Sequence, residues 1–424
     1  MLYRLKRDST MYIAAAKDEK SVIANHALKK ESVVDASGGI FLSALSHVPQ
    51  SLDMLVKKLL QTFTVVDAQT ILSDAREFYD GFVRDGYIVS GETYAELNAA
   101  EYGWGYDKDA AAAAERREAR SIAYFHLPGL FEHYDFYKEF LFVFFNYREF
   151  FYDWAAIGSI YGCPAYTVWN SGRVRNTGTR DTVKIARKLT QEYGVSARFT
   201  FTNSLLEERH LHDAFCNYLL DLFDDEKNGV ILHSDILQEY IAEKFPKYYF
   251  VSSITKCLSE KKRMLAELTD RRFRFVVTDY NFNNDFESLD LIPQGQRNKV
   301  ELLVDESCAP NCPVRRLDYE SVSRTSLYRN DVGDKEWRCP DSGARPNKRN
   351  FSAVKKTRHF IGLEAIQSEY LPKGFCNFKI EGRDYGDLRL LEEILYYMVK
   401  PEFQLDVREM MYLTDSANFP KAER

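Results

Sequence analysis

The sequence predicts an α/β protein of two domains: an N-terminal winged-helix-like α+β domain and a (β/α)8 barrel of the TIM type. Its 424 residues exceed what one hydrophobic core usually holds. In the second half, short apolar runs that end in polar residues alternate with helical patterns. A polar, alanine-rich segment precedes them and favours a helix with little apolar face. We therefore predict an N-terminal domain at residues 1–97, a linker helix at residues 98–118 and a barrel at residues 119–424.

The N-terminal domain is predicted from the order of its elements. Two short strands precede a short helix, two helices with apolar residues at helical spacing, and a return strand after an Asp-Gly turn. The strands are predicted at residues 10–16 and 32–36, the helices at 41–45, 52–63 and 71–82, and the return strand at 86–90. This order is that of a winged helix, which by itself indicates only a small regulatory or packing domain.

Eight predicted strands define the second domain. They lie at residues 165–170, 198–203, 229–234, 249–253, 273–279, 300–305, 359–362 and 376–381. Eight strand–helix units make a closed parallel barrel the economical solution. An open doubly wound sheet is the alternative, but the lack of a glycine-rich dinucleotide fingerprint favours the barrel. The dense aromatic residues between Tyr124 and Trp169 are predicted to be buried, because large rings dominate core packing.

Composition argues against several classes of protein. The net charge is -6, with 57 Lys and Arg against 63 Asp and Glu, so general nucleic-acid binding is not expected. The N-terminus is charged, and the longest apolar stretch, residues 140–151, is interrupted by polar residues. We expect a cytoplasmic protein without a membrane span. An odd number of cysteines, seven, does not suggest a disulfide framework.

The candidate site residues follow from the barrel, whose strands bring their carboxyl ends together at one mouth. The candidate catalytic residues at these ends are His233, Asp279, Lys379 and Glu381. The candidate substrate-binding residues are Asn170, Arg173, Asn281, Asn283 and Arg383.

Each of these candidates has a structural alternative. Lys379 and Glu381 stand two residues apart on one strand, so they are expected to pair inside the mouth and to serve acid–base chemistry. A purely structural ion pair is the alternative. His233 ends an apolar strand, where a core histidine is equally expected. The polar loop that follows Asp279 also fits a turn built from capping residues.

Three cysteines are the candidate metal ligands. Cys308 and Cys312 follow an apolar strand, and Cys339 lies in the loop beyond it. Soft thiolates grouped on one loop suit an iron–sulfur cluster or, alternatively, zinc. Three cysteines leave a fourth ligand position open, and thiols without a ligand role on an ordered loop are the alternative.

The N-terminal pattern resembles a known family. The run from Ser32 to Leu45, the helix that begins at Leu52, the segment from Asp74 to Phe82 and the strand after Gly86 are similar to the leader-peptide recognition domain of pyrroloquinoline-quinone chaperones. Such domains are often fused to enzymes that modify ribosomally made peptides. The resemblance implies that a precursor's leader adds a strand to the sheet edge and lies against the helix at residues 70–85.

A second resemblance concerns the end of the barrel. The motif Asn377-Phe-Lys-Ile-Glu-Gly-Arg383 resembles the terminal strand motif of the collagenase-like peptidase family. In that family a cysteine-bearing segment also lies upstream, and several members carry an iron–sulfur cluster and hydroxylate RNA or ubiquinone precursors without oxygen. The present chain departs from the family in its first domain and in lacking a recognisable four-cysteine pattern. The resemblance implies roles for Lys379, Glu381, Arg383 and the cysteine loop.

These observations lead to three hypotheses. The first is a maturation enzyme for a ribosomally synthesised peptide, which binds the leader with its N-terminal domain and modifies the core peptide in the barrel by iron–sulfur-assisted redox chemistry. The second is a non-catalytic partner that presents the peptide to a second modifying enzyme. The third is a peptidase, although no serine, cysteine–histidine or His-Glu-x-x-His constellation supports it.

Overall fold

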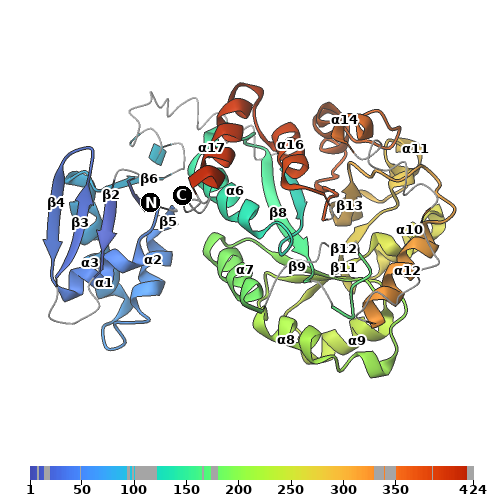
Figure 1. The fold of residues 1–424 in the computed structure, drawn as a ribbon, viewed down its shortest axis with the longest axis horizontal. Helices are drawn as coiled ribbons and strands as arrows, with labels where there is room; N and C mark the ends of the chain where they lie inside the picture. Colours follow the sequence, from blue (N-terminus) through green and yellow to red (C-terminus); the bar gives the residue numbers. More distant parts are fainter. Residues whose placement is uncertain are drawn as a thin grey trace, which may run out of the picture. The chain divides into compact units, whose positions relative to one another are not determined.

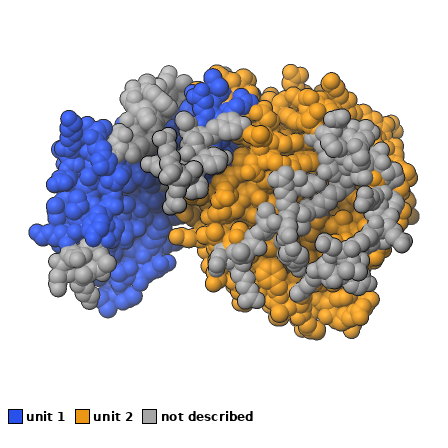
Figure 2. All heavy atoms as spheres, in the orientation of Figure 1, with its two compact units in different colours: residues 1–117, 139–153, 405–424 blue, residues 118–138, 154–404 orange. Residues whose placement is uncertain are grey.

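The structure is a computed structural model, and it divides into two compact units (Figure 2). Unit 1 consists of residues 1–117, 139–153 and 405–424, and unit 2 of residues 118–138 and 154–404. The described residues are 1–6, 9–13, 20–47, 49–92, 96–97, 100, 122–164, 167–172, 180–328, 339, 350–383 and 385–417. The predicted linker helix at 98–118, apart from Ala100, and the candidate Arg173 lie outside them.

Unit 1 contains two three-stranded antiparallel sheets in its described part (Figure 1). One has the order β5-β1-β6 and the other the order β2-β3-β4. The strands are β1 (Leu2–Leu5), β2 (Ser9–Tyr12), β3 (Ser21–Asn25), β4 (Lys30–Val34), β5 (Gln50–Ser51) and β6 (Ile88–Gly91). The predicted strands at 10–16, 32–36 and 86–90 correspond to β2, β4 and β6, whereas the other three strands were not predicted.

Three helices complete the small domain: α1 (Ala36–Ala44), α2 (Leu52–Leu59) and α3 (Ala68–Arg84). Each begins where a polar side chain satisfies a free backbone N–H. Asp35 accepts from the Gly38 N–H, Ser51 from that of Met54, and Asp67 from those of Gln69 and Thr70. The apolar faces of α2 and α3 bury Leu55, Leu59, Ile71 and Tyr79 in one core. The helices therefore form as predicted, and the winged-helix assignment of the whole domain remains a prediction.

Unit 2 contains a closed barrel of eight strands, all paired in parallel, in the order β10-β11-β12-β13-β14-β7-β8-β9 (Figure 1). The strands are β7 (Ala123–Pro128), β8 (Ala155–Gly162), β9 (Ala197–Phe201), β10 (Gly229–Leu232), β11 (Tyr249–Ser252), β12 (Phe273–Val277), β13 (Val300–Leu303) and β14 (Asn377–Lys379). This confirms the predicted barrel.

From residue 134 onward, helices lie between the barrel strands in the chain and after the last of them. They are α6 (Tyr134–Asn146), α7 (Arg180–Tyr193), α8 (Ala214–Leu222), α9 (Asp235–Lys244), α10 (Lys261–Thr269), α11 (Phe286–Leu289), α12 (Arg315–Tyr328), α14 (Phe351–Val354), α15 (Leu363–Ala365), α16 (Asp387–Met398) and α17 (Gln404–Ala417). The division into units assigns most of α6 and nearly all of α17 to unit 1. Some of the aromatic residues of α6 and the segment after it are buried as predicted, among them Phe144 and Phe151, whose ring centroids lie 4.8 Å apart. Others, such as Phe142 and Phe145, are only partly buried. No helix in the described ranges is long and apolar enough to cross a membrane.

Two predicted strands were wrong, and β7 and β8 take their places. Residues 167–170 form a turn, in which the Asn170 N–H donates to the Thr167 carbonyl, and residues 359–362 contribute no barrel strand. The sequence of β8, Ala-Ala-Ile-Gly-Ser-Ile-Tyr-Gly, is rich in small residues that weaken a strand pattern. Its Gly158 is needed because a Cβ there would lie 2.5 Å from the His126 ring. Close packing therefore overrides the local preference.

Candidate functional site

The candidate site is a cavity of about 120 Å³ formed by residues at and beyond the carboxyl ends of the barrel strands, where active sites of such barrels form. Its ionisable lining residues are Tyr161, Glu306, Cys308, Cys312, Arg315, Asp318, Tyr319, Cys339, Lys379, Glu381 and Arg383. The predicted residues that line it are thus Lys379, Glu381, Arg383 and the three cysteines. The other described candidates do not line the cavity. They are Asn170, His233, Asp279, Asn281 and Asn283.

A buried ion cluster forms the floor of the cavity. Glu301 in β13 accepts from the guanidinium of Arg198 in β9 at 2.5 Å and from the Lys379 ammonium in β14 at 3.2 Å. The Lys379 Nζ also lies 3.9 Å from the ring centroid of Tyr161. Burial and the cations of Arg198 and Arg383 outweigh the attraction of Glu301 and lower the pKa of Lys379 to about 8.

His126 is buried and belongs to the same cluster. Its Nδ1 lies 2.9 Å from the Ser159 hydroxyl and its Nε2 lies 3.6 Å from Glu301. Burial and the charge of Arg198 lower the pKa of His126 to about 3, so its ring is neutral at physiological pH. This buried histidine–serine pair does not line the cavity and therefore does not form a nucleophile–base pair for a substrate.

The expected pairing of Lys379 with Glu381 was wrong. Both side chains line the cavity, as their spacing predicts, but no ion pair joins them: Lys379 pairs with Glu301. Glu381 instead accepts hydrogen bonds from the Ser307 N–H at 3.0 Å and the Tyr385 hydroxyl at 2.9 Å. Its carboxylate is held at the cavity wall, while Lys379 is held at the floor.

Two buried carboxyl groups, those of Asp305 and Glu393, lie behind Glu381, and Asp305 binds its backbone. The Asp305 Oδ1 accepts from the Glu381 N–H at 2.8 Å, and Glu393 in α16 accepts from the Arg389 Nε at 2.5 Å. Asp305 Oδ2 and Glu393 Oε2 are buried, and neither has another hydrogen-bond partner among the described residues. Burial raises the pKa of Asp305 far above its usual range and that of Glu393 to about 7. The two carboxyl groups interact electrostatically, so a proton on one of them would satisfy both oxygens.

Arg383 is held against the opposite wall. Its Nη1 donates to the Thr200 hydroxyl at 2.6 Å and to the Asn170 Oδ1 at 3.4 Å. Asn170 in turn accepts from the Gly172 N–H at 3.0 Å. A Cβ at Gly172 would lie 1.4 Å from the Arg383 guanidinium, so only glycine permits this approach. Asn170 therefore helps to position Arg383, one of three cations that line the cavity among the described residues.

Asp279 acts on the cavity through another residue. It is fully buried and pairs with the guanidinium of Arg315, which lines the cavity. Its Oδ1 also accepts from the Asn281 side chain at 2.6 Å, and Asn281 accepts from the Asn311 N–H next to Cys312. Asn283 donates to two backbone carbonyls, those of Leu303 and His359. These three predicted residues thus order the cysteine loop and Arg315 without lining the cavity.

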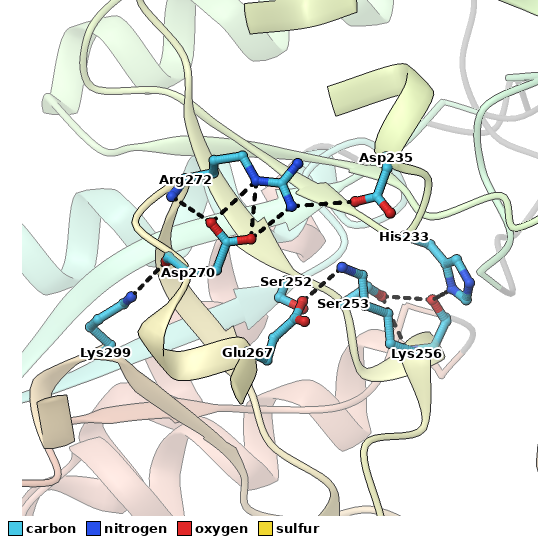
Figure 3. A network of polar contacts seen from close by, with 10 residues as sticks. His233, Asp235, Ser252, Ser253, Lys256, Glu267, Asp270, Arg272 and Lys299 are labelled. Carbon is cyan, nitrogen blue, oxygen red and sulfur yellow. Dashed lines mark hydrogen bonds and ion pairs between the residues drawn. The ribbon is translucent and has the colours of Figure 1, made fainter. Parts of the chain in front are cut away.

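His233 belongs to a network of polar contacts (Figure 3) and does not line the cavity. Its Nδ1 lies 2.9 Å from the Thr255 hydroxyl, which donates to the Ser253 hydroxyl at 2.9 Å. Thr255 and Ser253 line the cavity. Burial, with Lys256 nearby, lowers the pKa of His233 to about 4, so the ring is neutral and its role here is to fix the two hydroxyl groups.

The three predicted metal ligands, Cys308, Cys312 and Cys339, line the same cavity. Within the described ranges, no three His, Cys, Asp or Glu side chains are grouped as a metal site requires.

Sequence reasoning missed several residues of the site. Arg198 and Glu301 were hidden within apolar strands, and Arg315 and Tyr161 belong to no motif. The signal for the first two is a charge inside a strand that is otherwise buried, because a buried charge must be paired.

Comparisons with known proteins give one weak structural neighbour. It is a U32 (collagenase-like) peptidase, with a TM-score of 0.38 and 16% sequence identity over 53% of this chain and 84% of the peptidase chain. No model of a protein family matches the sequence, and no curated protein matches it. The fold and site thus define an α/β protein with a closed parallel barrel and a charged, thiol-lined cavity.

Proposed function

We propose that the protein is a maturation enzyme for a ribosomally synthesised peptide, with leader binding in unit 1 and chemistry in the barrel cavity. The observation that carries the catalytic half is the cavity itself. A lysine with a pKa of about 8, a carboxylate and an arginine, each fixed by hydrogen bonds or ion pairs, line it together with three thiols. A barrel that needed only stability would gain nothing from these charges at its strand ends.

Features of unit 1 support the leader-binding half. Among the described strands, β4 pairs with β3 alone, which leaves one edge of β4 for an added strand. Val34 in β4 and Phe78 and Phe82 in α3 are only partly buried against the domain core. A leader that adds a strand beside β4 would find apolar side chains on β4 and α3 for its own apolar residues.

The first prediction separates binding from chemistry. The full chain should bind the leader of a precursor encoded beside it with micromolar or tighter affinity, roughly -8 kcal/mol or stronger, measured by calorimetry. Lys379→Met should abolish modification of the precursor in a mass-spectrometric assay while leaving leader affinity unchanged. The matched control is Lys373→Met, because Lys373 pairs with Asp290 on the surface and does not line the cavity.

Three outcomes would each redirect the proposal. Absence of binding to any adjacent precursor contradicts the peptide-maturation function. Binding without modification by the wild-type protein, whatever cofactor is supplied, favours a partner that presents the peptide to a second enzyme. Cleavage of the precursor favours the peptidase.

An iron–sulfur cluster, or zinc, is part of the proposal. Three soft thiolate donors line one cavity, those of Cys308, Cys312 and Cys339, which is the donor type that such a group prefers, and a fourth ligand stays open. A bound cluster would supply one-electron transfer. The chain's own contribution is to bind and orient the substrate with Arg383 and Glu381 and to hold or move a proton at the Lys379 amine.

The second prediction concerns metal content. Anaerobically purified protein should contain iron and sulfide, or else zinc, in proportion to chain. Replacing Cys308, Cys312 or Cys339 with alanine should lower that content, whereas replacing Cys216, a buried thiol on α8 that does not line the cavity, should not. Equal metal content in all variants would remove the ligand assignment.

A further inference from the structure

Lys379 combines features that acid–base chemistry alone does not require. It is 6% exposed, ends strand β14 and lines the cavity together with Tyr161, Glu381 and Arg383. Its nitrogen has one anionic partner, the Glu301 Oε1 at 3.2 Å, and rests on the ring face of Tyr161. The amine is therefore held in a fixed position at the floor of the cavity.

The surroundings of Lys379 favour a neutral amine more than is usual for lysine. The charged or titratable groups around it are Arg198, Glu301, His126, Arg383 and Tyr161. Burial and the two arginines disfavour the ammonium form and Glu301 favours it, so the pKa of Lys379 lies at about 8. At pH 7.5 roughly a quarter of such amines are neutral, against roughly one in a thousand for an exposed lysine. A desolvated lysine beside other cations is the usual setting of an amine nucleophile.

Charged groups that can assist the remaining steps lie around the amine. Glu301 stays ionised, because the cations of Arg198 and Lys379 overcome the effect of burial and hold the pKa of its carboxyl well below the usual range. It accepts a hydrogen bond from Nζ at 3.2 Å and thereby orients the amine. Glu381 and Arg383 line the same cavity, where a carbonyl oxygen would lie.

We propose that Lys379 is a nucleophile toward carbonyl compounds and forms a Schiff base with an aldehyde or ketone bound in the cavity. The neutral amine attacks the carbonyl carbon, the C–N bond forms, and the π electrons of the carbonyl move to oxygen, which takes up a proton. Loss of that oxygen as water and of one proton from nitrogen gives the imine. The step is redox-neutral, and it does not depend on the proposed peptide substrate.

Reductive trapping tests this directly. The wild-type protein is incubated with butanal and sodium cyanoborohydride at pH 7.5, and peptide mapping by mass spectrometry locates the alkylated lysines. We expect Lys379 to be alkylated about tenfold or more faster than the exposed lysines. The rate at Lys379 should rise with pH and level off above about pH 8, whereas that at exposed lysines should rise to about pH 10.

Lys299 is the matched control, because it is another partly buried lysine of lowered pKa. Its ammonium donates to the Leu268 and Asp270 carbonyls outside the cavity, so its reaction should not exceed that of exposed lysines. If Lys299 is alkylated as fast as Lys379, a lowered pKa alone explains the reaction and the cavity plays no part, which overturns the proposal. No alkylation of Lys379 would show that it is only a structural cation. Because the wild-type protein is labelled, a variant that fails to fold cannot obscure either result.

Discussion

Replacing Glu301 with glutamine is expected to lower the free energy of unfolding by about 3 to 5 kcal/mol. Glu301 is fully buried and is the shared anion of Arg198, Lys379 and the His126 ring. Glutamine keeps the size of the side chain and removes the charge. Two buried cations are then left without a counter-ion, and this is the costly way to break a buried ion pair. The effect is large because solvent cannot screen these charges.

Urea unfolding at pH 7, followed by circular dichroism, measures this loss. Glu243→Gln is the matched control, since Glu243 lies exposed near the end of α9 and its replacement should change stability by less than about 0.5 kcal/mol. A loss below about 1 kcal/mol for Glu301→Gln would mean that the cluster does not hold the charges assigned to it. The same variant should raise the fraction of neutral Lys379, because its attracting anion is gone.

Some barrel strands could be predicted from the sequence and others could not, because only some of them have a clear pattern of apolar residues. Strands β9 to β14 could be predicted because apolar runs end abruptly in polar residues. Strands β7 and β8 were not predicted. For β8 the reason is its small residues, which carry little strand preference, and one of them, Gly158, permits the close approach of His126. The run at 359–362 was misleading because apolar residues also pack outside the barrel: Ile361 is buried and its N–H donates to the Val304 carbonyl beyond the end of β13.

The site shows the same division. The strand-end rule brought Lys379, Glu381, Arg383 and the cysteines together correctly, because the parallel strands of a barrel end at one mouth. Pairing within the site could not be inferred, since it crosses strands far apart in sequence. Lys379 meets Glu301 across a β13–β14 register that no local pattern encodes. The leader-binding function of unit 1 stays a prediction, because it depends on a partner.

The stability of the protein should fall as pH rises, because the Glu393 carboxyl loses its proton. Burial raises the pKa of this carboxyl from an ordinary value near 4.5 to about 7. The folded protein therefore binds a proton more tightly than the unfolded chain between these two values. The stabilising contribution of the protonated carboxyl is fully present below about pH 4.5 and is lost as pH rises through 7. Asp305, whose pKa burial raises as well, acts in the same direction.

Glu393→Gln tests this sign, because glutamine cannot lose a proton. Between pH 4.5 and 8, the stability of the wild-type protein should fall by about 2 to 3 kcal/mol more than that of the variant, at about 1.4 kcal/mol per pH unit over the range where the carboxyl ionises. Urea unfolding across this range gives both curves. Glu392→Gln is the control, since Glu392 is the exposed neighbour on α16 and its variant should follow the wild-type curve. Parallel curves for wild type and Glu393→Gln would mean that the carboxyl is already ionised at low pH. In that case a proton between Glu393 and Asp305 would not contribute to the position of Asp305, which binds the Glu381 N–H.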